Sequence, residues 1–226
     1  MSILDKEKII EEQLNKICTS SYSLTHLTRY KQTLKYIIPH ITNNMSILDV
    51  GGEGDLIKTV LNSVFTNINV ENTDCDLRYD FITKLQEYDL IISLEVIEHI
   101  KDRDSPCIEL ISTQYNSGIW NFFINCNRLL KKDGILFLTT PNVNSIVSIC
   151  SSLEYYHPCI YKPHPKELSL QEIFTYCNKC DFNIITYDTF NVWNTPISNT
   201  NLMDDIIKVL KKYNLQKALI KRKCKM

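Results

Sequence analysis

The spacing of hydrophobic positions is helical in the first forty residues and becomes strand-like after that. In residues 3–18 and 24–38, apolar side chains recur every three or four positions, which predicts two helices. Pro39 is expected to stop the second helix, because proline cannot continue a helical hydrogen-bond pattern. We therefore expect residues 1–44 to form an N-terminal helical extension.

From residue 45 onward, short apolar runs alternate with helical segments. The runs predict strands over 47–50, 67–71, 88–94, 135–140, 182–190 and 218–223. The intervening pattern predicts helices over 55–65, 119–130, 166–180 and 201–213, and a turn at 132–134. Such alternation is typical of a parallel sheet with right-handed crossovers, so residues 45–226 are expected to form one doubly wound α/β domain. In these sheets ligands bind beyond the carboxyl ends of the strands.

Three of the five glycines lie in the turn that follows the first expected strand. Gly51, Gly52 and Gly54 separate that strand from the next helix. Glycine lets the backbone turn sharply and lets a ligand approach the main chain closely. This turn therefore predicts a site for a nucleotide-like ligand, with a purely structural turn as the alternative.

Acidic residues follow the second expected strand. A carboxylate only accepts hydrogen bonds, so an acid at this strand end can accept both hydroxyls of a ribose. We expect Asp74 to do so, with Asp76 nearby. Glu71 is the alternative, because a sequence pattern locates a strand end only to within a few residues. A solvated acidic loop is the other interpretation.

The strand expected over 88–94 leads directly into Glu95, Glu98 and His99. If this turn is helical, the three side chains lie on one face, because their spacing is i, i+3 and i+4. Ionisable groups at the carboxyl end of a strand favour a functional site. The alternatives are that Glu98 caps a helix and that His99 is a surface residue.

These segments, in this order, resemble the class I S-adenosylmethionine-dependent methyltransferases over residues 45–193. The family's first motif is Asp/Glu-x-Gly-x-Gly-x-Gly, which Asp49 and Gly51 match, whereas Glu53 and Asp55 stand where glycine is usual. Residues 88–100 and 129–142 are similar to two further motifs of the family.

The resemblance implies a Rossmann-like methyltransferase fold with a mostly parallel, seven-stranded sheet, and S-adenosylmethionine as the cofactor. It implies that Asp74 holds the ribose and that Asp76 lies nearer the adenine edge. The implied cofactor-binding residues are Asp49, Gly51, Gly52, Gly54, Asp74, Asp76 and Glu95.

Two short segments are most similar to one subset of this family, which is associated with polysaccharide biosynthesis. They are residues 73–78 (Thr-Asp-Cys-Asp-Leu-Arg) and 161–167 (Tyr-Lys-Pro-His-Pro-Lys-Glu). The subset implies a small-molecule acceptor, namely a hydroxyl of a sugar, a sugar-nucleotide or a related precursor. Only 14 residues separate Asp74 from Asp89, so this part of the fold is expected to be abbreviated.

Methyl transfer to a hydroxyl requires in-line positioning and removal of a proton. We expect His99 to accept that proton, since an unperturbed imidazole titrates near neutrality. His164 is the second candidate, because the resemblance places its loop over the site. Glu95, Glu98 and His99 also resemble a Glu-x-x-Glu-His triplet that binds a divalent ion in quinone-pathway and RNA-terminal methyltransferases, so use of a metal is left open.

Charge and hydropathy restrict the remaining alternatives. The formal net charge is −1, which gives no bulk attraction to nucleic acid, and the basic residues of 221–225 are also typical of an edge strand. No apolar run reaches the roughly 20 residues of a membrane span, and residues 1–12 have no apolar signal core. We expect a cytoplasmic enzyme, with a catalytically inactive binding protein and a nucleic-acid methyltransferase as alternatives. The oligomeric state is left open.

Overall fold

A computed structural model of the chain describes residues 2–52, 55–73, 75–103, 117–155, 159, 161, 163–190 and 200–212. The chain divides into two compact units, Met1–Thr139 and Thr140–Met226. The described helices of the first unit are α1 (Ile3–Ile17), α2 (Ser21–Ile37), η1 (Ile38–His40), α3 (Leu56–Asn62), η2 (Ile97–His99) and α5 (Gly118–Leu129). Its strands are β1 (Ser46–Val50), β2 (Asn69–Thr73), β3 (Tyr88–Leu94) and β4 (Leu130–Thr139).

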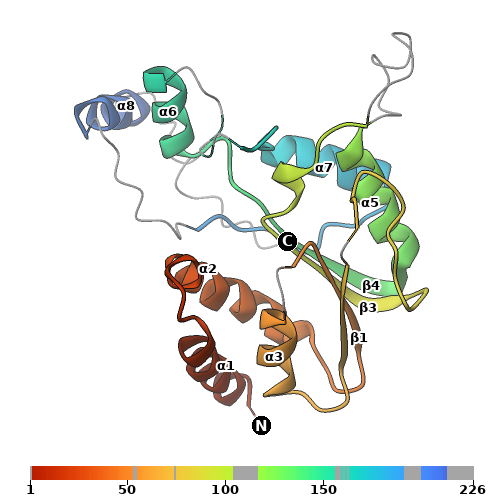
Figure 1. Cartoon of the computed structure of the whole chain (residues 1–226). Helices are drawn as coiled ribbons and strands as arrows, with labels where there is room; N and C mark the ends of the chain where they lie inside the picture. The colour runs from red at the N-terminus through yellow and green to blue at the C-terminus, as the bar shows by residue number, and fades with distance from the viewer. Residues whose placement is uncertain are drawn as a thin grey trace. The chain divides into compact units, whose positions relative to one another are not determined.

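The four strands form one parallel sheet in the order β2-β1-β3-β4 (Figure 1). β1 is central, with Leu48 paired to Glu71 of β2 on one side and to Ile91 of β3 on the other. The observed strands agree with those expected around residues 47–50, 67–71, 88–94 and 135–140. The described residues thus confirm a Rossmann-like parallel sheet, but with four strands rather than seven.

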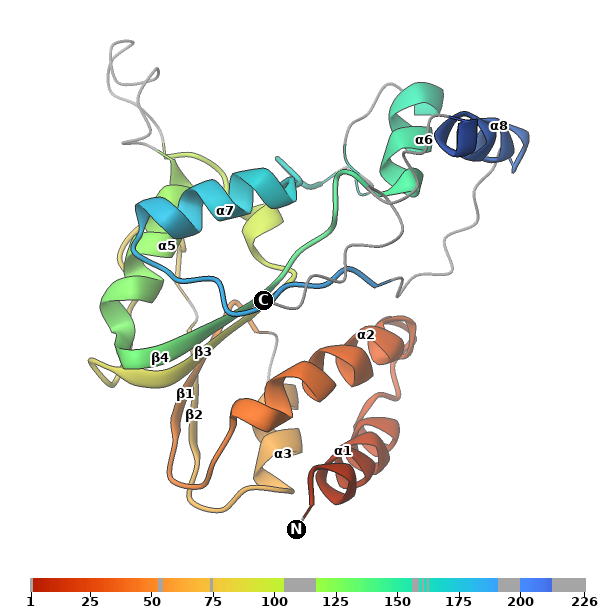
Figure 2. The same ribbon diagram turned by 180° about the vertical axis from the view of Figure 1, so that it is seen from behind.

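Helices cover both faces of this sheet, as a doubly wound fold requires. In two opposite views, α1, α2 and α3 lie on one side of the strands and α5 lies on the other (Figures 1 and 2). The N-terminal helices share one core with the sheet, because Ile10 of α1 and Leu34 of α2 belong to the same buried cluster as Ile47 and Leu90. The two N-terminal helices therefore belong to the helical layer on that side of the sheet.

Local chemistry explains where these helices begin and end. The Ser2 hydroxyl accepts a hydrogen bond from the Asp5 backbone N–H, and Asp5 accepts one from the Ser2 backbone N–H, which satisfies two donors at the start of α1. Ser20 and Ser23 cap α2 in the same way. α2 ends at Ile37, and the short η1 turn, which contains Pro39, begins at the next residue. The sequence predicts this end from Pro39. None of the described helices combines the length and apolar character needed to cross a membrane.

The segment between β2 and β3 is abbreviated, as its length predicts. Residues 75–87 contain neither a helix nor a strand. A buried network holds the segment instead: the Tyr88 hydroxyl donates to Glu71 Oε2 at 2.6 Å, and the Lys84 backbone N–H donates to Glu71 Oε1 at 2.5 Å. Burial, together with the bond to Glu71, raises the pKa of Tyr88 to about 12. Glu71 thus anchors this connection to the middle of β2.

The expected turn at 132–134 is a bulge inside β4. Tyr88 pairs with Leu130, and Leu90 pairs with Ile135. Because β4 has more residues than β3 between these two pairs, the register shifts there. Asp133 has a φ of 65°, a left-handed conformation that ends the regular pairing locally. The pattern therefore located the irregularity correctly, although the strand continues on both sides of it.

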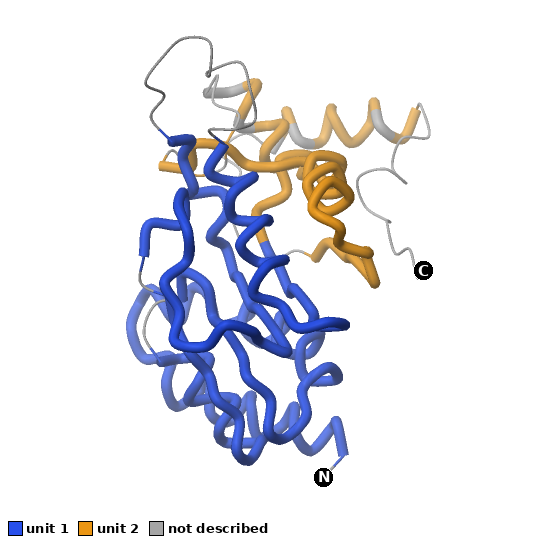
Figure 3. The backbone as a smooth tube through the Cα atoms, turned by 90° about the vertical axis from the view of Figure 1, so that its right-hand side faces the viewer, with its two compact units in different colours: residues 1–139 blue, residues 140–226 orange. Residues whose placement is uncertain are grey.

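The second unit contains α6 (Ile146–Tyr155), α7 (Leu170–Lys179) and α8 (Thr200–Lys212) (Figure 3). The expected helices over 166–180 and 201–213 correspond to α7 and α8, whereas the sequence pattern missed α6. The strand expected over 182–190 is wrong: Tyr187 forms a single bridge, and the rest of the segment is irregular. The Tyr187 ring packs edge-on against Phe174 of α7, with ring centroids 5.1 Å apart. The strand expected over 218–223 lies outside the described residues.

Tyr88→Phe is expected to lower the free energy of unfolding by roughly 1–3 kcal/mol, because it leaves a buried Glu71 oxygen without its donor. Urea denaturation measures this change. Tyr79→Phe is the matched control, since Tyr79 is 47% exposed and should change stability by no more than about 0.5 kcal/mol. Equal stability of both variants would show that the Tyr88–Glu71 bond is not important for the fold.

Candidate active site

Gly51, the first residue after β1, connects the carboxyl ends of three strands. Its backbone N–H donates to the Thr73 hydroxyl at the end of β2, at 3.3 Å. Its φ is 71°, a conformation that favours glycine, and a Cβ here would lie 2.7 Å from Cγ1 of Val96, after β3. A side chain at this position would clash with Val96, so the position requires glycine.

Asp49 is a buried carboxyl group one residue before the end of β1. It is 2% exposed, and burial raises its pKa to about 7. A Cβ on Gly52 would run into the Asp49 carboxylate, so the second glycine leaves room for this acid. A carboxyl group that titrates near neutrality at a strand end is typical of a functional site. Gly52 thus packs directly against Asp49, whereas Gly51 packs against Val96.

Gly54 and Asp74, two of the expected cofactor ligands, lie outside the described residues. β2 ends at Thr73, so Asp74 is the next residue in the chain. Glu71 lies two residues inside β2 and is 8% exposed. Tyr88 and Lys84 each donate to one of its oxygens, so a ribose bound at Glu71 would have to share them.

Asp76 is held by Arg78 of the same loop. The Arg78 Nη2 donates to Asp76 Oδ2 at 2.7 Å, and Arg78 Nε donates to both carboxylate oxygens at 3.0 and 3.1 Å. These hydrogen bonds lower the pKa of Asp76, so the group is a carboxylate at neutral pH. A ligand would share this carboxylate with Arg78.

Glu95 takes an unexpected conformation directly after β3. Its φ is 59°, and its backbone N–H donates to the Thr139 carbonyl oxygen at 3.0 Å. Its side chain lies 3.7 Å from Nη1 of Arg29, an ion pair with both side chains largely buried. Since the turn is not helical at Glu95, this residue does not share one face with Glu98 and His99. Among the described residues, no cluster with metal-binding spacing contains Glu95.

Arg29 is a residue of this region that the sequence pattern did not identify. It comes from α2, and its guanidinium carbon lies 5.1 Å from the centroid of the Tyr30 ring. Burial, together with the nearby Arg29 charge, lowers the pKa of His26 to about 4, so this histidine is neutral at pH 7. In the sequence, Arg29 stands out only as a charged residue within the apolar stripe of a helix. Its partner, Glu95, is 66 positions away along the chain.

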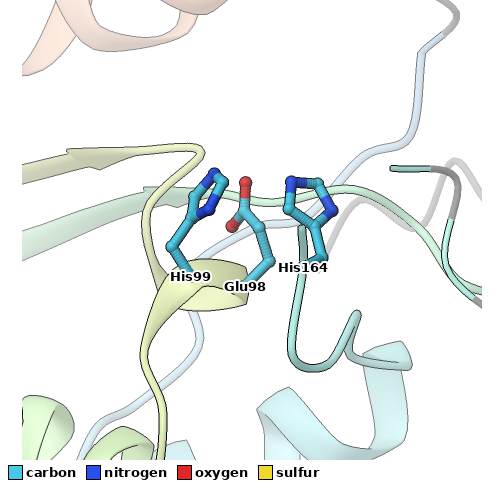
Figure 4. A group of neighbouring side chains, drawn as sticks. All are labelled: Glu98, His99 and His164. Atoms are coloured by element: carbon cyan, nitrogen blue, oxygen red, sulfur yellow. The ribbon is translucent and has the colours of Figure 1, made fainter. Parts of the chain in front are cut away.

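Glu98 and His99 are neighbours on the short η2 turn after β3 (Figure 4). The His99 backbone N–H donates to the Val96 carbonyl oxygen at 2.9 Å, which fixes the turn. Glu98 is 1% exposed, whereas the His99 side chain is exposed. The structure therefore places an accessible imidazole beside a buried carboxyl group at the carboxyl end of β3.

His164, also drawn in Figure 4, belongs to the second unit. Its Nδ1 lies 2.7 Å from Oε1 of Glu167, and the Tyr161 ring packs edge-on against the imidazole at 5.1 Å. Sequence reasoning singled out the segment that contains this pair but gave Glu167 no role.

The site residues that are described fit a nucleotide-containing cofactor. The left-handed Gly51 packs against Val96, and the buried Asp49 lies beside Gly52. Both lie at the carboxyl edge of a parallel sheet, where such folds bind their ligands.

Comparisons with known proteins agree with this fold. A family model described as a methyltransferase domain matches residues 24–187. A SAM-dependent methyltransferase structure from Archaeoglobus fulgidus is 14% identical, and the match covers 88% of this chain and 95% of that chain with a TM-score of 0.48. A chain of the complex between the Haloferax volcanii Trm112 methyltransferase activator and a methyltransferase is 10% identical, with coverages of 88% and 93% and a TM-score of 0.50. No curated protein sequence gives a match.

The parallel sheet and the family match together define a Rossmann-like methyltransferase. Because the family match spans most of the chain, the chain belongs to the methyltransferase domain family. It is therefore an S-adenosylmethionine-dependent methyltransferase, and S-adenosylmethionine is its cofactor.

Asp49→Asn is expected to change how stability depends on pH. The unfolded chain loses this proton near pH 3.8, whereas the folded protein keeps it to about pH 7. Between these values folding binds a proton, so the contribution of Asp49 to the free energy of unfolding falls as pH rises. The melting temperature of Asp49→Asn minus that of wild type should therefore increase from about pH 4.5 to 7 and then level off.

Asp89→Asn is the control with the opposite sign. Burial acts to raise the pKa of Asp89, but hydrogen bonds from Ser46 and Lys131 outweigh it and lower the pKa. This variant should be less stable than wild type at neutral pH, with the difference vanishing as pH falls through the lowered pKa. A pH-independent difference for Asp49→Asn would show that Asp49 is ionised in the folded protein.

Proposed function

We propose that this enzyme is an O-methyltransferase that acts on a hydroxyl of a sugar, a sugar-nucleotide or a related polysaccharide precursor. The observation that supports it best is the exposed His99 imidazole on η2, at the sheet edge that also holds Gly51. S-adenosylmethionine supplies an electrophilic methyl group on a sulfonium sulfur. A hydroxyl is a poor nucleophile while protonated, so an accessible imidazole near that edge suits this reaction.

The cofactor contacts are assigned by position along the sheet edge. Gly51, Gly52 and Gly54 offer backbone at the end of β1, with Asp49 behind them. Asp74 accepts hydrogen bonds from the ribose hydroxyls, and Asp76 lies nearer the adenine. Glu95 lies at the end of the site that β3 forms. Thr73 supports this assignment, because its hydroxyl ties the glycine loop to the strand that leads into Asp74. The Arg29–Glu95 pair supports it further by holding the turn after β3 against α2.

His99 is assigned as the residue that takes the proton from the acceptor hydroxyl, and His164 as a second contact to the acceptor. Glu98, buried next to His99, is in place to favour the protonated imidazole once the proton has moved. A carbohydrate acceptor rests on the likeness of residues 73–78 and 161–167 to the polysaccharide-associated subset. The net charge of −1 agrees with a small-molecule acceptor rather than nucleic acid.

Residues 45–226 are assigned to the cofactor-binding domain, with residues 1–44 as a helical extension whose α2 contributes Arg29. The reaction is assigned to the cytoplasm.

Asp74→Asn is expected to weaken S-adenosylmethionine binding by roughly 10-fold or more, because a neutral amide loses the charged acceptor for two hydroxyls. Isothermal titration calorimetry measures the affinity, and circular dichroism checks that the fold is intact. Glu71→Gln is the control, and it should lower stability more than affinity since Glu71 binds Tyr88. If Glu71→Gln weakens binding and Asp74→Asn does not, the ribose assignment is wrong.

His99→Ala is expected to lower kcat by roughly 10²–10⁴-fold with nearly unchanged cofactor affinity, as for loss of a general base. A labelled-methyl assay with sugar, sugar-nucleotide, quinone-precursor and RNA acceptors supplies both the acceptor and the rate. His40→Ala, a histidine on η1 before β1, should behave as wild type.

Three outcomes would contradict the proposal. Full activity of His99→Ala removes this residue from the mechanism. Loss of wild-type activity in a chelator, restored by a divalent ion, replaces the base with a metal ion. Transfer only to quinone precursors or RNA excludes the carbohydrate acceptor.

A further inference from the structure

A buried arginine of the first unit lies beside the turn that follows β3. Arg29 belongs to α2, and its side chain is 9% exposed. Its Nη1 lies 3.7 Å from Glu95 Oε2, a distance that allows an ion pair but is too long for a hydrogen bond. Among the residues that the structure describes, no group accepts a hydrogen bond from Arg29 Nε. A buried cation thus keeps a donor that these residues leave unused.

A second buried polar atom adjoins the same turn. Phe137 of β4 packs against the core that the N-terminal helices share with the sheet. Because side chains alternate along a strand, Thr139 points to the same face as Phe137, which is the face that α2 covers. The Thr139 carbonyl oxygen accepts from the Glu95 backbone N–H, and its buried hydroxyl has no hydrogen-bond partner in the described part of the chain. Arg29 and Thr139 therefore approach Glu95 on the same side of the sheet.

A structural ion pair alone does not explain this arrangement. Burial of two charges costs hydration, and their attraction offsets that cost only where the geometry is good and further hydrogen bonds satisfy the remaining donors. The Arg29–Glu95 pair is long, and Nε of Arg29 has no acceptor among the described residues. A ligand that accepts hydrogen bonds from the guanidinium would therefore stabilise this site.

The neighbouring rings of α2 carry no charge at neutral pH. Burial, together with the Arg29 charge, lowers the pKa of His26 to about 4, and burial raises the pKa of Tyr30. Glu95 is thus the one acidic group of the described residues that pairs with Arg29. In the proposed cofactor site Glu95 faces S-adenosylmethionine, whose sulfonium is positive. A Glu95 carboxylate engaged with that cofactor leaves the guanidinium to pair with another anion.

The place of Arg29 along the sheet edge favours the methyl acceptor as the source of that anion. The proposed ribose contact follows β2, whereas Thr139 ends β4, the strand at the other end of the order β2-β1-β3-β4. Three strand spacings of about 4.8 Å separate the two positions. The acceptor must approach the methyl group in line with the sulfur and from its far side. An acceptor at the ends of β3 and β4 lies there, next to η2 and Arg29.

We infer that Arg29, together with the Thr139 hydroxyl, binds an anionic group of the methyl acceptor, either a carboxylate or a phosphate. A planar guanidinium donates to two oxygens of either group. The identity of the reacting group rests on the proposed function, and the inference narrows it: the acceptor is a sugar acid or a phosphorylated sugar, including a sugar-nucleotide, and not a neutral sugar.

Contact between Arg29 and an anion can be measured without methyl transfer. ¹H–¹⁵N spectra of arginine-labelled protein report the Nε–H group, and Arg29→Lys assigns its signal by disappearance. Inorganic phosphate, glucose 1-phosphate, glucuronate and glucose are added in turn to protein saturated with S-adenosylhomocysteine. We expect a saturable shift of the Arg29 signal with the anionic probes and none with glucose. The absence of a shift with every anion overturns the inference.

The carboxylate of the cofactor is the competing source, and a second measurement separates the two. S-adenosylhomocysteine and 5′-methylthioadenosine share the nucleoside and the sulfur, but only the first has an amino-acid carboxylate. Isothermal titration calorimetry should give nearly unchanged affinities for both in Arg29→Lys. A selective loss of S-adenosylhomocysteine affinity would assign Arg29 to the cofactor and contradict the inference.

Arg29→Lys should weaken binding of glucose 1-phosphate and glucuronate roughly 10-fold, because lysine keeps the charge but loses the planar fork. Glucose binding should not change. Arg128→Lys is the matched control, since Arg128 is an exposed arginine on α5 and should leave every affinity unchanged. Equal weakening of charged and neutral sugars would make Arg29 a structural residue. If Arg29→Lys does not fold, proximity of Nε–H to the Tyr30 ring assigns the wild-type signal instead.

Failure of the inference and failure of the proposed function give different results. Methylation of neutral sugars at equal rates by wild type and Arg29→Lys would contradict the inference and leave the proposed function intact. An Arg29 signal that shifts with anionic probes, in an enzyme that methylates only non-hydroxyl acceptors, would contradict the proposed function instead.

Discussion

Parallel pairing of β1 with β2 and β3 is the interaction on which the rest of the site depends. β1 is the central strand of this trio, and the two registers bring the strand ends to one edge of the sheet. Gly51 can therefore bond to Thr73 on one side and pack against Val96 on the other. A loop with a side chain at Gly51 could not do both. The spacing of the strands thus dictates where glycine is required.

Buried acids maintain this edge in three different ways. Glu71 fixes the short connection from β2 to β3 through Tyr88 and Lys84. Among the described residues no donor binds the Asp49 carboxyl group, and burial raises its pKa to about 7. Glu95 is held by Arg29 from α2, across the turn that precedes His99. The three carboxyl groups therefore differ in role. Glu71 and Glu95 stabilise the fold through a hydrogen bond or an ion pair, whereas Asp49 is available for chemistry.

The sequence pattern predicts the parts of the fold that depend on local periodicity. β3 has the predicted bounds, and the glycines after β1 lie where the strand-to-helix pattern puts them. The left-handed conformation of Glu95 could not be predicted, because it depends on a hydrogen bond to Thr139 of a later strand. Arg29 was missed for the same reason, since an ion pair between residues far apart has no periodic signal. Over 182–190 only Tyr187 forms a bridge, so the apolar pattern of that segment did not suffice to predict pairing with another strand.

The central claim is that the carboxyl ends of β1, β2 and β3 form the S-adenosylmethionine site. Hydrogen–deuterium exchange with and without S-adenosylhomocysteine, the demethylated product, tests it directly. A bound ligand lowers the population of locally open states, so exchange should slow in peptides that cover residues 50–52, 73–76 and 94–99. Peptides from α8 should be unchanged. Protection confined to α8, or no protection at the three strand ends with saturating ligand, would contradict the account.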